Sequence, residues 1–249
     1  MLEEYGDDLA VIFVESQGAN AKRAESFAYD RGWMGRGAYW TLERPASTGL
    51  GYLPSFILLD VDGKVLLKGN TGSMKGKIKD AIKDQIKDAR DLPEEYGKDF
   101  KKAWKALVED DWAKASELIA KEAEDGGENA SQAASMSARL EARIESDYLA
   151  IERRIELGYF VEALERAEAF AEQTEEIEKW STAADELLTQ LRSESLTTEL
   201  EADQAFTKVY ESVCEDGVED NERALGKFAS KYAGTKAAAR AEHLLSLID

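Results

Sequence analysis

Residues 1–92 alternate short apolar runs with stretches of helical periodicity. The first run, residues 9–15 (Leu-Ala-Val-Ile-Phe-Val-Glu), is apolar and β-branched, which predicts a strand buried on both faces, as in a parallel sheet. The helical stretch after it places Ala24, Phe27 and Ala28 on one face. The whole pattern predicts strands at 9–15, 38–41, 55–60 and 65–69 and helices at 20–30 and 74–91.

The turn between the third and fourth predicted strands carries its own signal. Val61-Asp62-Gly63-Lys64 contains an Asp-Gly pair, which favours a tight hairpin. Asp60 and Asp62 flank this turn, and we interpret them as turn formers, because a Ca²⁺ loop needs more oxygen ligands at set spacings. The helix that follows has Ile78, Ile82 and Ile86 four residues apart on one face.

Every segment after Leu92-Pro93 has the periodicity of a helix. Glycines at 126–127, 158, 217 and 234 mark breaks between the segments. The predicted helices are 99–123, 130–157, 160–174, 176–192, 198–214 and 221–247.

An internal repeat runs through this helical part at an offset of 48 residues. Leu107, Trp112, Ala115 and Ile119 recur as Ile155, Phe160, Ala163 and Ala167. A bulky aromatic and a small alanine three residues later share a helix face, so the small residue lets a neighbouring helix approach. A third segment, from Ala224 to Ala241, has a related pattern. The region resembles divergent tetratricopeptide-type repeats of helical hairpins.

Charge separates the two parts of the chain. Residues 1–92 hold 13 Lys/Arg and 14 Asp/Glu, whereas residues 93–249 hold 19 and 37. A balance of −1 followed by −18 indicates two segments with different surfaces. The acidic part would repel phosphate backbones and anionic membranes, so we expect no nucleic-acid partner. No apolar run is long enough for a membrane span, so no membrane insertion is expected.

Cysteine and histidine are nearly absent, which limits the chemistry of the chain. Cys214 and His243 are the single residues of their types. An intrachain disulfide is therefore excluded, and so is a His/Cys metal cluster. The acidic neighbours of Cys214 oppose thiol reactivity, so we interpret it as structural. His243 is placed on the last helix. The tryptophans are expected in the core or as anchors between domains, and they are Trp33, Trp40, Trp104, Trp112 and Trp180.

The stretch from Leu50 to Gly69 is the most informative in the chain. Tyr52-Leu53-Pro54-Ser55 leads into a strand, which is followed by Asp60, an Asp-Gly-Lys turn and a second strand. This string resembles the cis-proline strand and hairpin of thioredoxin-like proteins, in particular the redoxin-class bacterial thiol–disulfide oxidoreductases, which serve cell redox homeostasis. The resemblance covers about residues 1–91. It implies that Pro54 is cis and that the backbone at Leu53 pairs with an extended substrate segment.

The chain departs from that family at its centre, because it has no Cys-x-x-Cys motif. The resemblance places that motif before residue 9, and residues 1–7 look like the end of the helix that follows it. The strand that carries the motif in the family would lie between 9–15 and 55–60. Three alternatives stay open: these two strands pair directly, another chain supplies a strand, or the sequence is an N-terminally truncated product, which we favour.

The predicted fold class is therefore an incomplete α/β thioredoxin-like domain, residues 1–92, followed by an acidic all-α repeat-like domain, residues 93–249. We expect a binding or scaffolding module for a protein or peptide, with a homodimer that completes the sheet as a further option. No catalytic residue, metal ligand or cofactor is predicted, and the substrate-facing loop is Tyr52, Leu53, Pro54 and Ser55.

The alternative function is a thiol–disulfide oxidoreductase whose Cys-x-x-Cys segment is missing from this chain. The acidic N-terminus is not a signal peptide. This favours a cytoplasmic location for the chain as given, whereas a truncated member of the family would belong to the cell envelope or periplasm.

Overall fold

The computed structural model divides the chain into two compact units, which are described separately. Unit 1 comprises residues 1–89, 210–223 and 244–249, and unit 2 comprises residues 90–209 and 224–243. The first division lies close to the predicted boundary at 92, whereas two C-terminal segments group with the N-terminal part. The described residues are 2–5, 9–31, 33–34, 38–44, 47–124 and 126–248. Most of them are helical, so the prediction of a largely helical protein is confirmed.

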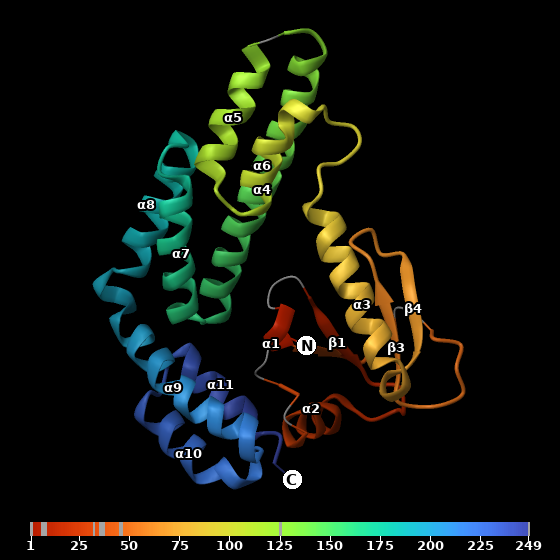
Figure 1. Cartoon of the computed structure of the whole chain (residues 1–249). Helices are drawn as coiled ribbons and strands as arrows, with labels where there is room; N and C mark the ends of the chain where they lie inside the picture. The colour runs from red at the N-terminus through yellow and green to blue at the C-terminus, as the bar shows by residue number, and fades with distance from the viewer. Residues whose placement is uncertain are drawn as a thin grey trace. The chain divides into compact units, whose positions relative to one another are not determined.

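Unit 1 contains the four predicted strands and the two predicted helices (Figure 1). A helix at Leu2–Tyr5 precedes them, within the residues 1–7 predicted to be helical; residues 1, 6 and 7 lie outside the described part. The elements of its N-terminal segment are α1 (Leu2–Tyr5), β1 (Val11–Val14), α2 (Ala21–Asp30), β2 (Ala38–Thr41), β3 (Ser55–Leu59), β4 (Val65–Asn70) and α3 (Thr71–Arg90).

Side-chain caps and turns explain where these elements begin. The Asn20 side chain accepts a hydrogen bond from the Arg23 amide at 2.9 Å, which caps α2. Asp60 Oδ1 accepts from the amides of Asp62 at 3.0 Å and Lys64 at 2.8 Å. Asp60 therefore closes the β3–β4 turn, and its predicted role as a turn former is confirmed.

The strands form two separate two-stranded sheets. β1 pairs in parallel with β2, and β3 pairs antiparallel with β4. Direct pairing of the first and third strands, one of the three alternatives, is therefore wrong for the described residues. The expectation that residues 9–15 are buried on both faces is also wrong, because Ile12 and Val14 are exposed. A two-stranded sheet has no second layer over that face, so alternate side chains of β1 stay in contact with solvent.

The C-terminal segments of unit 1 pack on α2. The hydroxyls of Tyr29 and Tyr210 lie 3.4 Å apart, and Lys22 Nζ donates to the Ile248 carbonyl at 3.0 Å. Burial raises the pKa of the Tyr29 hydroxyl. The core of unit 1 thus includes residues more than 180 positions apart in the sequence. Further buried apolar residues of these segments are Val213, Val218, Leu244 and Leu247.

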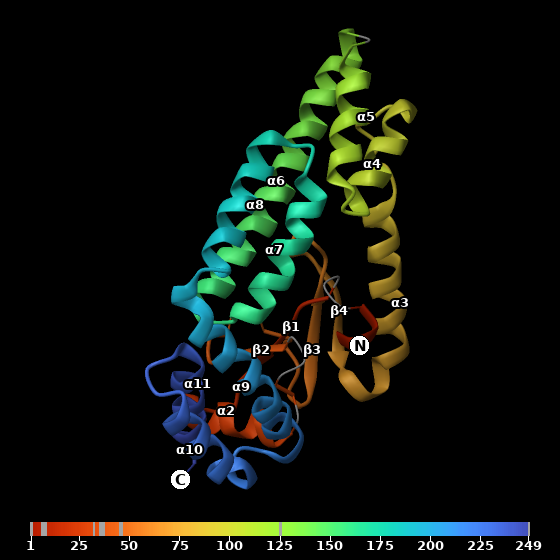
Figure 2. The same cartoon turned by 90° about the vertical axis from the view of Figure 1, so that its left-hand side faces the viewer.

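Unit 2 consists of helical hairpins. Among them, α6, α7, α8 and α9 correspond closely to predicted helices. Helix α9 crosses the division between the units and ends in unit 1. Figure 2 shows α6, α7 and α8 side by side, with α7 in contact with both of the others. The helices are α4 (Lys101–Val108), α5 (Trp112–Glu124), α6 (Gly127–Leu157), α7 (Phe160–Thr174), α8 (Glu178–Leu191), α9 (Thr197–Asp216), α10 (Glu222–Lys231) and α11 (Lys236–Leu245), with short 3-10 turns at Lys98–Phe100 and Glu194–Leu196. The 3-10 turn at Glu219–Asn221 belongs to unit 1, as do the first residues of α10 and the last residues of α11.

Two predicted helices are each divided in the structure. The predicted helix 99–123 is interrupted at Asp110, whose φ of 59° lies in the left-handed region. Aspartate tolerates this conformation, and helical periodicity alone does not reveal it. The predicted helix 221–247 is interrupted at Gly234, with φ of 90°, one of the glycines that indicated a break in the sequence.

The repeat at an offset of 48 is present as two equivalent helical hairpins. Asp110 and Gly158, which are 48 residues apart, are both in the left-handed region, and each lies two residues before the next helix. The Asp111 amide donates to the Ala106 carbonyl at 3.0 Å, and the Tyr159 amide donates to the Arg154 carbonyl at 2.9 Å. Both bonds are the six-to-one bond of a Schellman motif, so the two turns share one geometry.

The repeated positions form the core of unit 2. Each of the two repeated aromatic residues begins its helix and is buried, as is the alanine three positions later. The cluster of buried residues extends from Tyr96 to Leu191. These two pairs of equivalent residues are Trp112 with Phe160 and Ala115 with Ala163.

The core placement predicted for the tryptophans is confirmed for three of them. Trp104, Trp112 and Trp180 are buried in unit 2. Trp33, in unit 1, is partly exposed and stacks on Phe13 with ring centroids 4.4 Å apart. The tryptophans of unit 2 therefore stabilise its helical core, whereas Trp33 remains in contact with solvent.

Candidate functional site

The loop Tyr52–Ser55 lies directly before β3 in unit 1. The Leu53–Pro54 peptide bond is cis, which confirms that prediction. Tyr52 and Leu53 are 48% and 54% exposed. Large apolar side chains that are half exposed on a short loop contribute little to a core. Their exposure makes this loop a candidate contact surface.

Asn70 holds this loop in place from the end of β4. Its Nδ2 donates to the Pro54 carbonyl at 3.2 Å. Its Oδ1 accepts from the amides of Gly72 at 2.9 Å and Ser73 at 3.2 Å, which caps α3. One side chain therefore fixes the position of Pro54 relative to both the hairpin and the helix. Asn70 was not among the predicted site residues, although an asparagine directly before a helix is a cap signal.

The strand that follows the loop has a free edge. In the described residues, β3 pairs only with β4, and β1 pairs only with β2. A free edge presents alternate backbone N–H and C=O groups without strand partners. It can accept an extended segment through main-chain hydrogen bonds.

Exposed apolar side chains are concentrated in unit 1. Ile12 and Tyr39 are register partners on β1 and β2, and both are more than half exposed. Leu59 and Val65 are partners near the turn of the β3–β4 hairpin and are exposed too. Contiguous exposed apolar surface is typical of interaction sites. In unit 2, the corresponding large exposed side chains among the described residues are Leu149, Leu157 and Tyr159.

Few side chains of this protein could support thiol or metal chemistry. Cys214 lies on the part of α9 that belongs to unit 1 and is half-buried. The predicted position of His243 on the last helix is confirmed, since it lies on α11. Among the described residues, no three His, Cys, Asp or Glu side chains gather in a way that could hold a metal ion. None of the described helices has the length and apolar composition needed to cross a membrane.

A cluster of aromatic rings joins the helices α6, α7 and α8 in the core of unit 2. The Tyr148, Phe170 and Trp180 rings, one from each helix, have centroids 5.7 to 6.1 Å apart. Glu141 of α6 binds Lys179 of α8 and accepts a hydrogen bond from Trp180 Nε1 at 2.9 Å. These bonds lower the pKa of the Glu141 carboxyl group.

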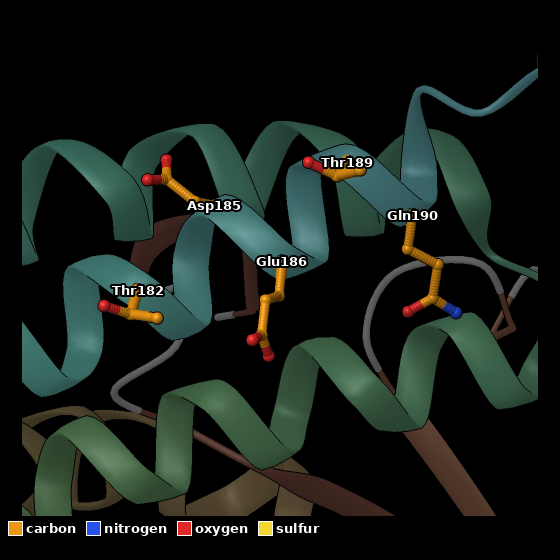
Figure 3. Close-up of a pocket in the computed structure, with 5 residues that line it drawn as sticks. All are labelled: Thr182, Asp185, Glu186, Thr189 and Gln190. Carbon is orange, nitrogen blue, oxygen red and sulfur yellow. The ribbon is translucent and has the colours of Figure 1, made fainter.

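A shallow hollow continues along the exposed face of α8 beyond this aromatic cluster (Figure 3). Figure 3 shows Glu186 and Gln190 extending to the same side of the helix, whereas Asp185 extends to the other. Helical periodicity predicts that the lining residues, all on α8, are exposed, but it does not predict the hollow itself. It is lined by Thr182, Asp185, Glu186, Thr189 and Gln190.

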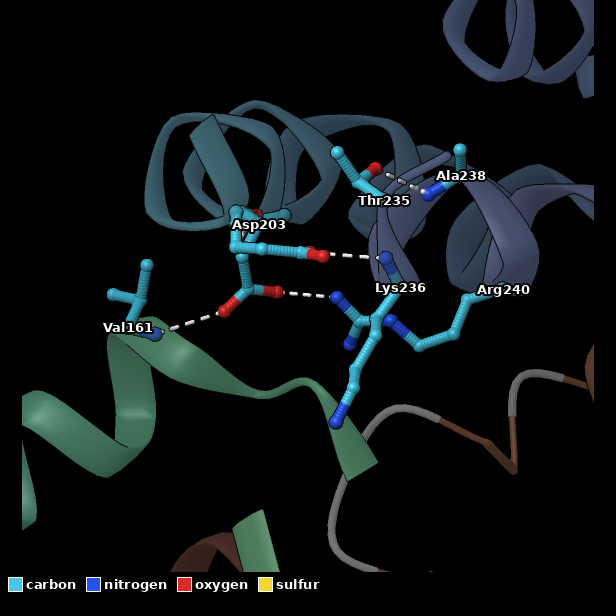
Figure 4. A network of polar contacts seen from close by, with 8 residues as sticks. Val161, Asp203, Thr235, Lys236, Ala238 and Arg240 are labelled. Carbon is cyan, nitrogen blue, oxygen red and sulfur yellow. Dashed lines mark hydrogen bonds and ion pairs between the residues drawn. The ribbon is translucent and has the colours of Figure 1, made fainter. Parts of the chain in front are cut away.

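A buried polar network joins three helices of unit 2 (Figure 4). Asp203 of α9 accepts a hydrogen bond from the Val161 amide in the first turn of α7 at 2.8 Å and pairs with Arg240 of α11. The Arg240 guanidinium lies over the rings of Tyr159 and Phe206, 4.4 and 4.8 Å from their centroids. A buried carboxylate that caps one helix and binds an arginine of another fixes their relative position. We assign this network a structural role.

Comparison of the chain with protein-family models, curated proteins and solved structures found no match. The functional assignment therefore depends on the geometry of the loop Tyr52–Ser55 and of the β3 edge, and on the resemblance carried by residues 50–69.

Proposed function

We propose that the chain is a protein-binding module whose unit 1 accepts an extended segment of a partner protein along β3. The observation that carries this proposal is the pair of exposed side chains Tyr52 and Leu53, which lead into a strand with a free edge. The Asn70 bond to Pro54 holds that entry in one position. A preorganised strand edge lowers the entropy cost of ordering a peptide on it.

The chemistry of such a partner follows from the surface. Main-chain hydrogen bonds along β3 would supply affinity without a sequence requirement. Selectivity would come from apolar side chains that contact Tyr52 and Leu53, since burial of each such side chain contributes about 1.5–3 kcal/mol. The expected partner is therefore an extended, partly apolar segment without proline at the positions that donate to β3.

Peptides selected from a display library on the intact chain provide the test. We expect Leu53→Glu and Tyr52→Ser to weaken binding of a selected peptide about tenfold or more. Val61→Ser is the matched control, because Val61 is 91% exposed at the hairpin turn and away from the loop. N-methylation of every second peptide amide should abolish binding when the methylated amides are the ones that donate to β3. Methylation of the intervening amides should leave binding unchanged. Equal losses in all three variants, or indifference to N-methylation, would contradict strand addition.

A second copy of the chain is the other occupant that the free edges could accept. A homodimer that completes the sheet would make the chain a structural subunit and would block peptide access to β3. Light scattering separates the two outcomes: a monomer that binds peptide supports the module, whereas a stable dimer disrupted by Leu53→Glu supports the subunit.

A thiol–disulfide oxidoreductase is the second candidate function. It is favoured by the order β3, Asp-Gly turn, β4 and α3, which the family string predicts and the structure contains. The chain as given has one cysteine, so we expect no turnover in an insulin-reduction assay. An in-frame Cys-x-x-Cys codon string upstream of Met1 in the DNA would support the enzyme, and an immediate stop codon would exclude it.

A further inference from the structure

The main-chain groups of β3 point alternately toward β4 and toward the free edge. The Asp60 amide, directly after β3, donates to the Lys64 carbonyl at 2.9 Å, so the main-chain groups of Asp60 point toward β4. Every second residue along an antiparallel strand points its N–H and C=O groups the same way. Those of Ser55, Ile57 and Leu59 therefore point to the free edge, where they would bond an added strand.

The two faces of the β3–β4 hairpin differ in what covers them. Gly69 is buried, because the side chain of Met74, on α3, fills the space where a Cβ of Gly69 would lie. Alternation along β4 places the exposed Lys68 on the opposite face. Ile57 is the register partner of Lys68 and so shares that face. One face of the hairpin thus packs on α3, and the face with Lys68 is open to solvent.

The open face of the hairpin combines one charge with an exposed apolar pair. Leu59 follows Ile57 by two residues and so shares its face, together with its own register partner Val65. The register shift between Leu58 and Leu59 is what puts Val65 and Lys68, three residues apart, on one face. Leu59 and Val65 are 48% and 56% exposed. Lys68 is the single charged residue of β3 and β4, which the structure describes in full.

The charge of Lys68 is not compensated within the described part of the chain. Lys64, at the hairpin turn, pairs with Asp62 at 3.3 Å, and Lys79 of α3 pairs with Glu4 at 2.5 Å. Among the described residues, no carboxylate forms an ion pair with Lys68. This lysine is therefore available to a carboxylate from another molecule, directly beside the strand that offers a free edge.

We propose that the segment that adds to β3 carries a carboxylate side chain opposite Ile57 and an apolar side chain two positions away, opposite Leu59. This inference rests on strand addition at β3 and specifies which partner is selected. The added strand would lie about 4.8 Å from β3 and about 10 Å from β4. The stem of Lys68 would pack across Ile57 while its charged end meets the carboxylate. The apolar side chain would cover the exposed pair Leu59 and Val65.

Fluorescence anisotropy with defined peptides and the intact chain tests this pattern. The probe is fluorescein-labelled Thr-Leu-Thr-Glu-Thr-Leu-Thr, which places a leucine two positions from the glutamate in either strand direction. A second peptide has Lys in place of Glu. We expect the unaltered chain to bind the glutamate peptide about fivefold more tightly than the lysine peptide. Lys68→Glu should invert this preference.

The spacing is tested by a peptide of the same composition, Thr-Thr-Leu-Glu-Leu-Thr-Thr. Its leucines adjoin the glutamate, so in a strand they would lie on the opposite face from the carboxylate. We expect its Kd to be about threefold or more above that of the probe. Equal affinity for the two glutamate peptides would overturn the proposed spacing.

Lys87→Glu is the matched control for the charge. It makes the same change at another exposed lysine of unit 1, on α3, and we expect it to alter the preference less than about twofold. Equal shifts in the two variants would show diffuse attraction and overturn the proposal. A lysine on an exposed strand can also serve only to hinder pairing between chains. That role would leave the preference unaltered by Lys68→Glu, which would overturn the proposal too.

The outcomes also separate this inference from strand addition itself. Peptides that bind regardless of their central charge, and lose affinity with Leu53→Glu, would support strand addition and overturn the carboxylate preference alone. Binding of library-selected peptides but not of the glutamate probe would do the same. If neither the defined peptides nor the library yields a binder, both proposals are overturned. Circular dichroism confirms that each variant is folded.

Discussion

At the scale of single residues, Glu141 makes a pH-dependent contribution to stability. Its bonds from Lys179 and Trp180 lower the pKa of the folded-state carboxyl group. A lowered pKa contributes stability above the unfolded-state value, near 4.5, and this contribution is lost as the pH falls through the folded-state pKa. Because the side chain is 45% exposed, solvent screening limits the effect to about 1 kcal/mol.

We therefore expect Glu141→Gln to lower the free energy of unfolding by about 1 kcal/mol or less at pH 7. The difference from the unaltered chain should shrink as the pH falls below the unfolded-state value. Urea unfolding at a series of pH values measures it. A difference that stays constant between neutral and acidic pH would show that packing, rather than charge, accounts for the loss.

Gly158 combines a left-handed backbone with a close approach of α11. Its φ is 82°, and a Cβ at this position would lie 2.5 Å from Lys236 Cβ. Gly234 has φ of 90° with open space around it, so it isolates the backbone effect. We expect Gly234→Ala to cost about 1–2 kcal/mol and Gly158→Ala about 2–4 kcal/mol. Thermal or urea unfolding of the two variants compares them, and equal losses would mean that Lys236 moves aside freely.

At the scale of elements, the Asp203–Arg240 pair joins α7, α9 and α11. Removal of one partner leaves the other charge partly buried, so we expect Asp203→Ala and Arg240→Met each to cost about 2–4 kcal/mol. The double variant should cost less than the sum by at least about 1 kcal/mol. The exposed Arg192–Glu168 pair is the control cycle, with an expected coupling below about 0.5 kcal/mol. Additive losses at Asp203 and Arg240 would contradict a direct pair.

The helices and strands show which features of the fold can be predicted from residues close together in the sequence. The strands, the Asp-Gly turn and most helix bounds were predictable, because they depend on apolar periodicity and turn residues close together in the sequence. The break at Asp110 was not, because aspartate adopts a left-handed conformation only in some contexts. The internal repeat did indicate a break at Asp110, because Asp110 aligns at an offset of 48 residues with Gly158, where a break was predicted.

The candidate sites also differ in whether residues close together in the sequence predict them. The loop at Leu53–Pro54 was predictable from a contiguous string of residues. The cluster of Tyr148, Phe170 and Trp180 depends on packing between three different helices, which periodicity does not specify. Asp203 gave a weaker signal: it is a charged residue beside Ala202 and near Phe206, both buried. Such a position on a buried helix face indicates a polar partner from another element.

At the scale of the whole molecule, the two units differ in how much core they have. The large cluster of buried residues extends from Tyr96 to Leu191 in unit 2. In the N-terminal segment of unit 1, the buried apolar side chains among the described residues are Ala28, Tyr29, Ile78 and Ile82. Two-stranded sheets are marginally stable without further strands or cover. Unit 1 should therefore open more readily than unit 2.

Hydrogen exchange of the intact chain, followed by mass spectrometry, measures this difference. We expect amides of β1 and β2 to exchange at least about tenfold faster than those in the middle of α6 and α7, because their opening exposes less apolar surface. A peptide that adds a strand to β3 should slow exchange in β3 and leave exchange in α6 and α8 unchanged. Uniform protection across both units would show a single cooperative structure, and unit 1 would then owe its stability to contacts beyond its own small core.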